Sequence, residues 1–323
     1  MTNDTILVLA EPDEPQVTAL KKRLWEVKII AGNFVDVFEQ AAVHANVLFN
    51  WSGSLALFRN VFELCPNLRW VHSRSVGLER TLFPEIIGSP VPLTNGTGVF
   101  SASLGEFALG SILYFAKNFR RMIRNQKAGI WEAFDVMPVS GQTVGIIGYG
   151  DIGRAIAARV RPLGMRVLAV KRNTSTLRGA DPLVDQLYSP EHRIEMLSRC
   201  DYVVVAAPLT SETRGMIGQP EFGAMKPSAV VINVGRGPVI DEKSLIGALS
   251  NGQIKGAALD VFDHEPLPDG HPFYKLENVL LSPHCADHTP DWHDQAMQFF
   301  IAQFERFQKG ERLLNVVDKK LGY

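Results

Sequence analysis

The stretch Thr143-Val144-Gly145-Ile146-Ile147-Gly148-Tyr149-Gly150-Asp151-Ile152-Gly153 decides the fold of this chain. Residues 143–147 form a short apolar run typical of a buried strand, and apolar residues at helical spacing follow it, namely Ile152, Ile156, Val160 and Leu163. In such a strand–turn–helix unit, Gly148 permits the tight turn, Gly150 lets a pyrophosphate approach the backbone, and Gly153 packs the helix against the strand. The helix N-terminus adds unpaired N–H groups for an anion. The stretch therefore predicts a dinucleotide-binding domain, with another nucleotide-like ligand or a packing turn as alternatives.

Further apolar runs on both sides extend this pattern. Near-continuous apolar character, typical of parallel strands buried on both faces, recurs at 166–170, 202–207, 230–233, 256–260 and 279–282. Earlier runs at 6–10, 45–49 and 68–72 alternate with amphipathic segments and predict a second α/β layer. A helix over 103–118 is apolar on most faces, so we expect it to be buried between domains or subunits. An aromatic-rich helix is expected over 291–309.

Composition limits the class of protein. The chain has 323 residues, which suggests about two domains, and it is 46% hydrophobic and 21% charged, as in soluble globular proteins. Its 33 basic and 34 acidic residues give a net charge of −1, which offers no overall field for nucleic acid or an anionic membrane. Three scattered cysteines without a CxxC pair support neither a zinc ribbon nor a disulfide framework. Because no signal peptide or membrane-spanning run is evident, we expect a cytoplasmic protein with no nucleic-acid or membrane partner.

The end of the second strand indicates which dinucleotide is bound. An NAD site usually places Asp or Glu about 20 residues after the glycines, to bind the ribose 2′-hydroxyl. Here the segment is Lys171-Arg172-Asn173-Thr174-Ser175, and no acid precedes Asp181. Cations and short polar side chains can hold a 2′-phosphate by charge-assisted hydrogen bonds. The segment therefore favours NADP(H), with NAD(H) possible and a solvated basic turn as the alternative explanation.

Three polar residues each follow one of the later strands. Arg236 comes just past 230–233, Glu265 past 256–260, and His284 past 279–282. Because ligands of open α/β sheets bind outside the carboxyl ends of the strands, these residues can converge although they are far apart in sequence. A guanidinium can grip a carboxylate and polarise a neighbouring carbonyl, an imidazolium can protonate an alkoxide, and a glutamate can orient the ring. Each residue alone has an ordinary structural explanation, but together they predict hydride transfer to a 2-oxo acid and no metal.

The chain resembles the D-isomer-specific 2-hydroxyacid dehydrogenases over nearly its whole length. The resemblance rests on the glycine motif and on four later motifs: Ala207-Pro208-Leu209-Thr210 with Thr213, Val231 to Gly237, Leu259-Asp260-Val261-Phe262 with Glu265-Pro266, and Ser282-Pro283-His284. It implies two Rossmann-like or flavodoxin-like α/β domains with parallel sheets and an active site in the cleft between them. Residues 1–100 plus 289–323 would form the substrate-binding domain and 101–288 the dinucleotide-binding domain. A homodimer built around the larger domain is also implied.

The resemblance also implies roles for individual residues. His284 would be the acid/base, Glu265 its partner and Arg236 the clamp for a small 2-oxo or 2-hydroxy acid. The substrate carboxylate would also meet backbone groups of a glycine loop, here Ser75-Val76-Gly77. Cofactor contacts are expected from the glycine loop with Asp151 and Ile152, from the basic segment Lys171 to Asn173, and from Pro208, Thr213, Val234, Arg236, Asp260 and His284. The basic segment resembles that of the glyoxylate and hydroxypyruvate reductases, which prefer NADPH.

Departures and alternatives accompany this resemblance. Cys285-Ala286-Asp287 replaces the usual apolar residue and small glycine-rich pair after the histidine. On the side of the substrate-binding domain, Arg74 adds a charge beside the carboxylate loop, and we expect Trp51 to form a wall of the cleft. A non-catalytic dinucleotide sensor of the corepressor type could keep the three polar residues, and it would bind cofactor without turnover. A metal enzyme could use His284, Asp287, His288, Asp291 and His293, but Pro283 and Pro290 interrupt the segment and HExxH is absent. Formate dehydrogenase is a further alternative within the same resemblance, but it carries glutamine at the position of Glu265, which argues against it.

Overall fold

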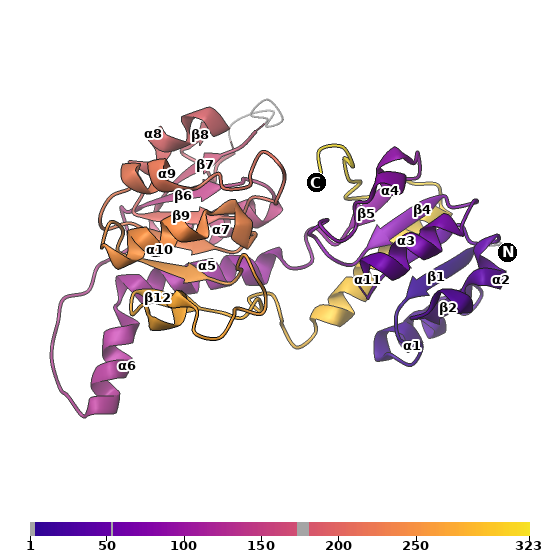
Figure 1. The fold of residues 1–323 in the computed structure, drawn as a ribbon, viewed down its shortest axis with the longest axis horizontal. Helices are drawn as coiled ribbons and strands as arrows, with labels where there is room; N and C mark the ends of the chain where they lie inside the picture. The colour runs from indigo at the N-terminus through magenta and orange to yellow at the C-terminus, as the bar shows by residue number, and fades with distance from the viewer. Residues whose placement is uncertain (1–3, 53, 173–180) are drawn as a thin grey trace. The chain divides into compact units, whose positions relative to one another are not determined.

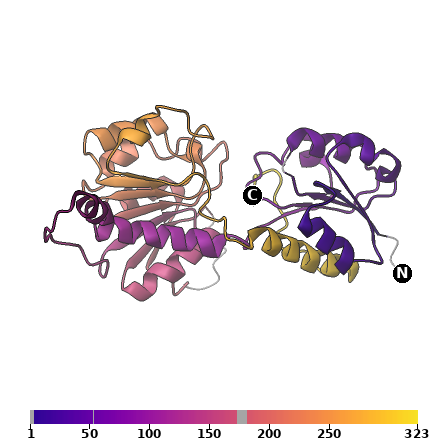
Figure 2. The ribbon, with the colours of Figure 1, turned by 90° about the horizontal axis from the view of Figure 1, so that it is seen from below.

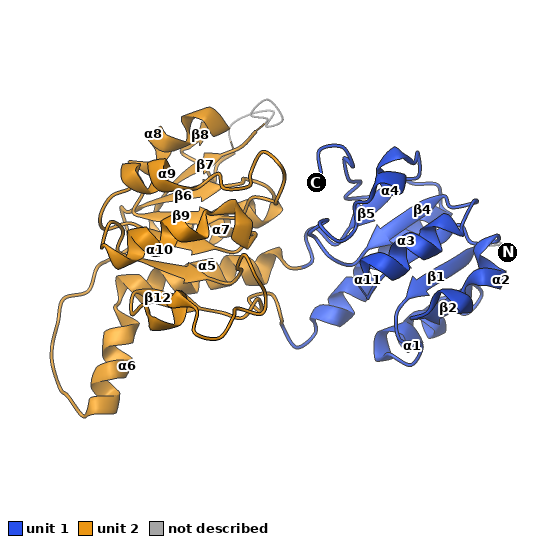
Figure 3. Ribbon diagram, in the orientation of Figure 1, with its two compact units in different colours: residues 1–99, 289–323 blue, residues 100–288 orange. Residues whose placement is uncertain are grey.

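The computed structural model describes residues 4–52, 54–172 and 181–323. The chain divides into two compact units, shown in blue and orange in Figure 3. Unit 1 comprises residues 1–99 and 289–323, and unit 2 comprises residues 100–288. These boundaries lie within one residue of those that the resemblance implies. No helix among the described residues is long and apolar enough to cross a membrane.

Unit 1 is built on a five-stranded parallel sheet. Its strands are β1 (Thr5–Leu9), β2 (Lys28–Gly32), β3 (Val47–Asn50), β4 (Trp70–Ser73) and β5 (Leu93–Asn95), in the order β2-β1-β3-β4-β5. This is the flavodoxin-like order of a doubly wound sheet. Helices cover both faces (Figure 2). They are α1 (Pro15–Arg23), α2 (Glu39–Ala42), α3 (Leu55–Glu63), α4 (Pro84–Gly88) and α11 (Trp292–Gln308), with a 3-10 turn, η1 (Val35–Val37).

Aromatic rings from both ends of the chain form part of the core of unit 1. Phe300 of α11 stacks on Phe49 of β3 with ring centroids 4.0 Å apart and on Trp70 of β4 at 5.2 Å. All three side chains are fully buried. On the sheet's other face, α3 contributes Phe58 and Val61 to a second apolar cluster. Because α11 follows unit 2 in the sequence, the last part of the chain completes the core that the first part begins.

Unit 2 contains a seven-stranded parallel sheet, which confirms the predicted α/β fold class. Its strands are β6 (Thr143–Ile147), β7 (Arg166–Val170), β8 (Gln186–Tyr188), β9 (Tyr202–Val205), β10 (Val230–Asn233), β11 (Gly256–Leu259) and β12 (Val279–Leu281). They run in the order β12-β11-β10-β9-β6-β7-β8. The order reverses between β6 and β9, which is where doubly wound sheets bind their ligands. The carboxyl ends of these two strands therefore mark the place to look for a cofactor site.

Helices cover both faces of this sheet as well (Figure 2). They are α5 (Ser101–Ala116), α6 (Phe119–Ala128), α7 (Asp151–Val160), α8 (Arg193–Leu197), α9 (Gln219–Ala224) and α10 (Glu242–Ser250), with the 3-10 turns η2 (Arg161–Leu163), η4 (Pro190–His192), η5 (Gly237–Val239) and η6 (Pro272–Lys275). The apolar helix expected over 103–118 is α5. It packs against α7 of the same unit, so contact with another domain or subunit is not needed to bury that face. A Cβ added at Gly105 would lie 3.1 Å from the Ala155 carbonyl oxygen, which shows how closely the two helices approach.

Residues 119–139 project from the rest of unit 2 as an arm (Figure 1). The arm consists of α6 and the segment that follows it. Its exposed apolar side chains are Phe119, Met122, Ile123, Ile130, Trp131, Val136 and Met137. The Trp131 side chain is 102% exposed, so none of its surface is covered within the chain. Large exposed apolar patches are uncommon on monomeric proteins, so this surface is a candidate interaction site.

Candidate active site

The glycine turn after β6 has the geometry that its sequence predicts. Gly148 has φ +95°, and a Cβ added there would lie 2.6 Å from the backbone nitrogen of Ala207. A Cβ at Gly153 would lie 2.5 Å from the Gly148 carbonyl oxygen, so this glycine lets α7 pack on the turn. At Gly150 an added Cβ would meet nothing within 4 Å. The backbone at Gly150 is therefore open to a ligand, while the other two glycines are required by the packing.

The first turn of α7 provides the donors for an anion. Gly150 is the N-cap and has no side chain to satisfy the helix N–H groups. The carboxylate of Asp151, the first helical residue, accepts a hydrogen bond from the Ser101 hydroxyl. Exposed helix N–H groups and the positive end of the helix dipole bind phosphates well. Together with the open backbone at Gly150, this turn fits the pyrophosphate of a dinucleotide, and Ile152 and Gly153 follow within the same helical turn.

The predicted 2′-phosphate site lies only partly within the described residues. Lys171 and Arg172 follow β7, whereas Asn173 lies outside the described part of the chain, as do Thr174 and Ser175. The Arg172 Nη1 atom lies 3.0 Å from Glu212 Oε2, in an ion pair whose side chains are 37% and 66% exposed. Exposed pairs of this kind contribute about 0–1 kcal/mol to stability. The basic residues are thus at the end of the second strand, where the sequence predicts them, and they carry an acidic neighbour that the sequence did not indicate.

Asp181, the first acid after the second strand, is used within the protein. Its carboxylate accepts hydrogen bonds from the Tyr149 hydroxyl, at 3.1 Å, and from Arg154. Its residue is 9% exposed. Burial, together with the hydrogen bond to Asp181, raises the pKa of Tyr149. Asp181 therefore anchors the glycine turn through Tyr149 and α7 through Arg154.

The predicted cofactor residues after β9 belong to one closed turn. The Thr213 hydroxyl donates to the Pro208 carbonyl oxygen at 2.6 Å and accepts from the Thr210 backbone N–H at 2.8 Å. The turn begins at the carboxyl end of β9, the strand next to β6 in the sheet. Pro208 and Thr213 are thus held together at the same edge as the glycine turn.

Arg236 lies on a turn between two glycines, and the packing around each of these glycines leaves no room for a side chain. A Cβ at Gly235 would lie 2.7 Å from the Ala207 carbonyl oxygen, and one at Gly237 would lie 2.0 Å from the carbonyl carbon of Phe262. The Asn233 side chain bridges the turn, because it accepts from the Gly235 N–H and donates to the Arg236 carbonyl oxygen, both at 3.1 Å. The Arg236 guanidinium donates to the Gly235 carbonyl oxygen at 2.7 Å. The preceding residue, Val234, is buried at the end of β10. Arg236, the predicted clamp, therefore rests on a hydrogen-bonded turn packed against the loop after β11.

Glu265 and His284 form the pair that the sequence predicts. The His284 Nδ1 atom lies 2.6 Å from Glu265 Oε2. The other carboxylate oxygen, Oε1, accepts from the backbone N–H of Phe262 at 2.9 Å, which fixes the carboxylate in its own loop. The His284 side chain is 41% exposed and the Glu265 side chain 34%. Because Nδ1 is occupied by Glu265, Nε2 is the ring nitrogen available for a substrate.

Asp260 holds the loop that carries the histidine. His284 has φ +51°, a left-handed conformation that is unusual for a residue with a side chain. Asp260 Oδ1 accepts from the backbone N–H groups of Cys285 at 3.0 Å and Ala286 at 3.1 Å, and from the Ser282 hydroxyl at 2.6 Å. Asp260 is 1% exposed. The sequence predicts Asp260 as a cofactor contact, and the structure adds a role in fixing His284 that sequence reasoning missed.

The unusual segment Cys285-Ala286-Asp287 contributes a second acid beside the histidine. Burial raises the pKa of Asp287, and the charges of His288 and His284 oppose that shift. His288 Nε2 lies 3.8 Å from Asp287 Oδ1. Within the described ranges, no three His, Cys, Asp or Glu side chains come together in a way that could hold a metal ion.

The substrate loop predicted in unit 1 lies at the carboxyl edge of that unit's sheet. Ser75-Val76-Gly77 follow β4 after one intervening residue, Arg74, and the Asn95 side chain at the end of β5 donates to the Val76 carbonyl oxygen at 3.0 Å. Just before the loop, the Arg74 backbone N–H donates to the Asn50 carbonyl oxygen at 3.1 Å. The Asn95 side-chain amide, at the end of β5, and the Asn50 backbone carbonyl, at the end of β3, thus hold this loop from the two strands that flank β4.

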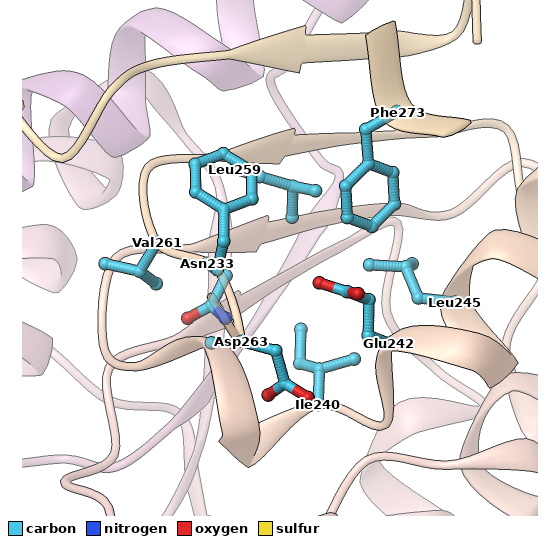
Figure 4. A pocket seen from close by; sticks show the side chains of 10 residues that line it. Asn233, Ile240, Glu242, Leu245, Leu259, Val261, Asp263 and Phe273 are labelled. Atoms are coloured by element: carbon cyan, nitrogen blue, oxygen red, sulfur yellow. The ribbon is translucent and has the colours of Figure 1, made fainter. Parts of the chain in front are cut away.

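A pocket of unit 2 lies at the ends of β10 and β11, and none of the three predicted catalytic residues lines it (Figure 4). Its lining comes from the ends of β10 and β11 and from α10 and η6, and comprises Asn233, Gly237, Ile240, Glu242, Leu245, Leu259, Val261, Phe262, Asp263 and Phe273. Beside it, the Glu242 carboxylate pairs with His271 Nε2 at 3.1 Å. Because it shares Gly237 and Phe262 with the contact described above, we interpret it as packing space between the loops that follow β10 and β11.

Comparison with known proteins identifies relatives along the whole chain. Residues 109–286 match the family described as D-isomer specific 2-hydroxyacid dehydrogenase, NAD binding domain. The chain is similar to a glyoxylate reductase from Korarchaeum cryptofilum, with 34% identity over 269 residues that cover 81% of this chain and 79% of the relative. A glyoxylate reductase from Thermococcus gammatolerans is 33% identical over 270 residues, with 81% and 79% covered.

Solved structures agree with this assignment. A D-isomer specific 2-hydroxyacid dehydrogenase from Xanthobacter autotrophicus, in complex with NADPH and MES, is 28% identical and superposes with a TM-score of 0.85 over 100% of both chains. An NADPH-dependent glyoxylate/hydroxypyruvate reductase from Sinorhizobium meliloti, in complex with NADP and malonate, is 25% identical with a TM-score of 0.78, covering 99% of this chain and 98% of that one.

Proposed function

Since the chain belongs to the D-isomer specific 2-hydroxyacid dehydrogenase family, we propose that it reduces small 2-oxo acids of the glyoxylate or hydroxypyruvate type to D-2-hydroxy acids. It is an NAD(P)-dependent oxidoreductase acting on CH–OH groups. The observation that carries the proposal is the His284–Glu265 pair, with 2.6 Å between Nδ1 and Oε2. The names of its relatives from Korarchaeum cryptofilum and Thermococcus gammatolerans support the substrate class.

The proposed chemistry divides between the cofactor and three side chains. The bound nicotinamide cofactor supplies the hydride for the C2 carbonyl. Arg236 binds the substrate carboxylate and polarises the carbonyl, because a guanidinium offers paired N–H donors and a fixed charge. His284 gives the proton on Nε2 to the oxygen that becomes the hydroxyl, while Glu265 stabilises the charged ring from the Nδ1 side. Backbone groups of Ser75-Val76-Gly77 bind the substrate carboxylate as well.

The catalytic assignment is tested by replacing the histidine. His284→Ala should lower kcat for glyoxylate by about 10²–10⁴-fold, the usual contribution of a general acid. The dissociation constant for NADPH, measured by fluorescence titration, should change much less. His264→Ala is the matched control, since His264 is an exposed histidine of the loop that carries Glu265. An unimpaired His284 variant would contradict the role, and a wild-type protein that binds NADPH but reduces neither glyoxylate nor hydroxypyruvate would indicate a sensor instead.

We further propose that NADPH is preferred, with Lys171 and Arg172 binding its 2′-phosphate. The support is their place at the end of β7, beside the open glycine turn. Arg172→Ala should raise the KM for NADPH by about 10–100-fold, because one charge-assisted hydrogen bond is lost. The KM for NADH should rise far less. Arg166→Ala is a suitable control because Arg166 is exposed at the opposite end of the same strand. Equal effects of the Arg172 replacement on both cofactors would count against the 2′-phosphate role.

We also propose that the enzyme is a homodimer held by the arm at 119–139. The support is the exposed apolar surface of the arm, and Trp131 above all. Trp131→Asp should convert a dimer into a monomer in light scattering after gel filtration. Trp25→Asp should leave the mass unchanged, because Trp25 is a comparably exposed tryptophan, at 77%, but belongs to unit 1. A wild-type monomer would contradict the proposal.

A further inference from the structure

Arg74 occupies an unusual position at the carboxyl edge of unit 1. It comes directly after β4 and directly before the loop Ser75-Val76-Gly77. The Cζ atom of its guanidinium lies 4.6 Å from the ring centroid of Trp51 and 5.1 Å from that of Trp292. Trp51 follows β3, whereas Trp292 is the first residue of α11. Two indoles from opposite ends of the sequence therefore hold one cation beside the proposed carboxylate loop.

The two indole rings contact this guanidinium without using its hydrogen-bond donors. Five N–H groups lie in the guanidinium plane, and stacking on aromatic faces leaves them directed outward. Among the described residues, no carboxylate or carbonyl oxygen is hydrogen-bonded to the Arg74 side chain. The nearby acid is Glu14, whose Oε2 accepts from the Trp51 indole N–H at 2.6 Å. Burial lowers the pKa of Arg74 and the charge of Glu14 opposes this shift, so the cation is partly desolvated and forms no ion pair with any described residue.

A second arginine of unit 1 shows what a purely structural stacking contact looks like. Arg69 lies just before β4, at the opposite end of the same strand, and its Cζ is 4.8 Å from the ring centroid of Phe307 of α11. Its side chain is 64% exposed and lies 4.0 Å from Asp4. Arg69 therefore has both water and a carboxylate. Arg74 is half-buried, and within the described ranges no carboxylate lies at ion-pair distance from its guanidinium, so its partial loss of water costs free energy unless an anion supplies acceptors.

We propose that Arg74 determines substrate specificity by binding a second acidic group of the substrate. The preferred substrates are then 2-oxo acids with a terminal carboxylate, of four or five carbons, rather than glyoxylate itself. This inference rests on the proposed function, because Ser75-Val76-Gly77 must bind the carboxylate next to the oxo group. Held between Trp51 and Trp292, the guanidinium loses little rotamer entropy when an anion binds, which favours a specific bidentate contact.

Two substrates of equal length test the inference on the unmodified enzyme. Oxaloacetate and 2-oxobutanoate both have four carbons and a 2-oxo acid group, and oxaloacetate alone carries the terminal carboxylate. The wild-type enzyme should show a kcat/KM for oxaloacetate at least about 10-fold above that for 2-oxobutanoate, as expected for one charge-assisted contact. The difference should lie mainly in KM. Equal values for the two substrates, or a preference for 2-oxobutanoate, would overturn the inference.

Arginine variants assign this preference to the side chain. Arg74→Met keeps the length of the side chain between the indoles but removes its charge, and it should reduce the preference for oxaloacetate to about 1. Arg74→Lys should restore part of it. Arg69→Met is the matched control, since it removes a stacked arginine from the other end of β4. It should change neither the kcat/KM for oxaloacetate nor that for 2-oxobutanoate. An Arg74→Met variant that loses both activities equally would show that Arg74 serves the shared carboxylate or the fold, and would overturn the inference. Failure of the wild type on every 2-oxo acid, glyoxylate included, would instead refute the proposed function on which it rests.

Discussion

The hydrogen bonds of Asp260 are expected to set the catalytic rate by holding His284 in its left-handed conformation. This conformation costs about 1–3 kcal/mol for a residue with a side chain. Against it stand three hydrogen bonds to Asp260 Oδ1, from Ser282, Cys285 and Ala286. Hydrogen bonds to a charged group contribute about 1.5–3 kcal/mol each, so the three together outweigh the strain by several kcal/mol. The loop is therefore stable only while most of this set is present.

A graded series of variants follows from this balance. Ser282→Ala removes one bond and leaves two that still exceed the strain, so kcat should fall by less than about 10-fold. Asp260→Asn keeps an acceptor oxygen but loses the charge, which about halves the strength of each bond, and kcat should fall by about 10-fold. Asp260→Ala removes all three bonds and leaves two backbone N–H groups unpaired. Its kcat should fall by about 10²–10³-fold, close to the loss expected for removing His284 itself.

The assay combines steady-state kinetics with cofactor binding. Glyoxylate reduction gives kcat and KM, and the quenching of tryptophan fluorescence by NADPH gives the dissociation constant. A positioning role predicts that kcat falls in the stated order while the NADPH dissociation constant stays within about threefold, since the lost contacts lie within the protein. If Asp260→Ala kept its kcat, the reasoning would be refuted. A variant that lost NADPH binding with kcat intact at saturation would show that Asp260 acts as a cofactor contact instead.

Two further predictions concern the stability of the units. Burial lowers the pKa of His72 to about 3, so at acidic pH the unfolded chain binds a proton that the native protein excludes. The free energy of unfolding should therefore fall by about 3 kcal/mol from pH 7 to pH 4. His72→Asn should remove this part of the pH dependence, as measured by urea unfolding. The same slope in the variant would contradict this. Gly237→Ala places a Cβ against backbone and should lower the free energy of unfolding by at least about 2 kcal/mol, whereas Gly247→Ala, with open space at that point, should not lower it. Equal stability of the two alanine variants would disprove the close contact.

The strands that the sequence predicts are those with continuous apolar character. Residues 143–147, 166–170 and 230–233 match β6, β7 and β10, because a strand buried on both faces needs apolar residues throughout. The strands that were missed are β2, β5 and β8, which lie at the edges of their sheets. β2 and β8 are partly exposed, so their composition resembles that of a loop, and β5 is buried but has only three residues, too few for a pattern to stand out.

Part of the candidate site follows from the position of residues along the strands, and the rest depends on the direction of their side chains. Arg236, Glu265 and His284 follow neighbouring parallel strands, and position alone predicts that they lie at one edge. The sequence also places Asp260 at this edge. Whether its carboxylate points to a ligand or back to the histidine loop depends on side-chain direction, which strand order does not give. Likewise, Arg74 and Trp51 stand out in the sequence, but their contact with Trp292 depends on how α11 packs on the sheet.

The insertion of unit 2 within unit 1 has a consequence for synthesis on the ribosome. Residues 100–288 emerge complete and can form their own sheet while the first unit still lacks α11. Until residues 292–308 are translated, Phe49 and Trp70 have no Phe300 to cover them. The nascent polypeptide thus exposes an apolar aromatic surface through most of its elongation. We expect chains truncated after unit 2 to be bound by chaperones and degraded by proteases.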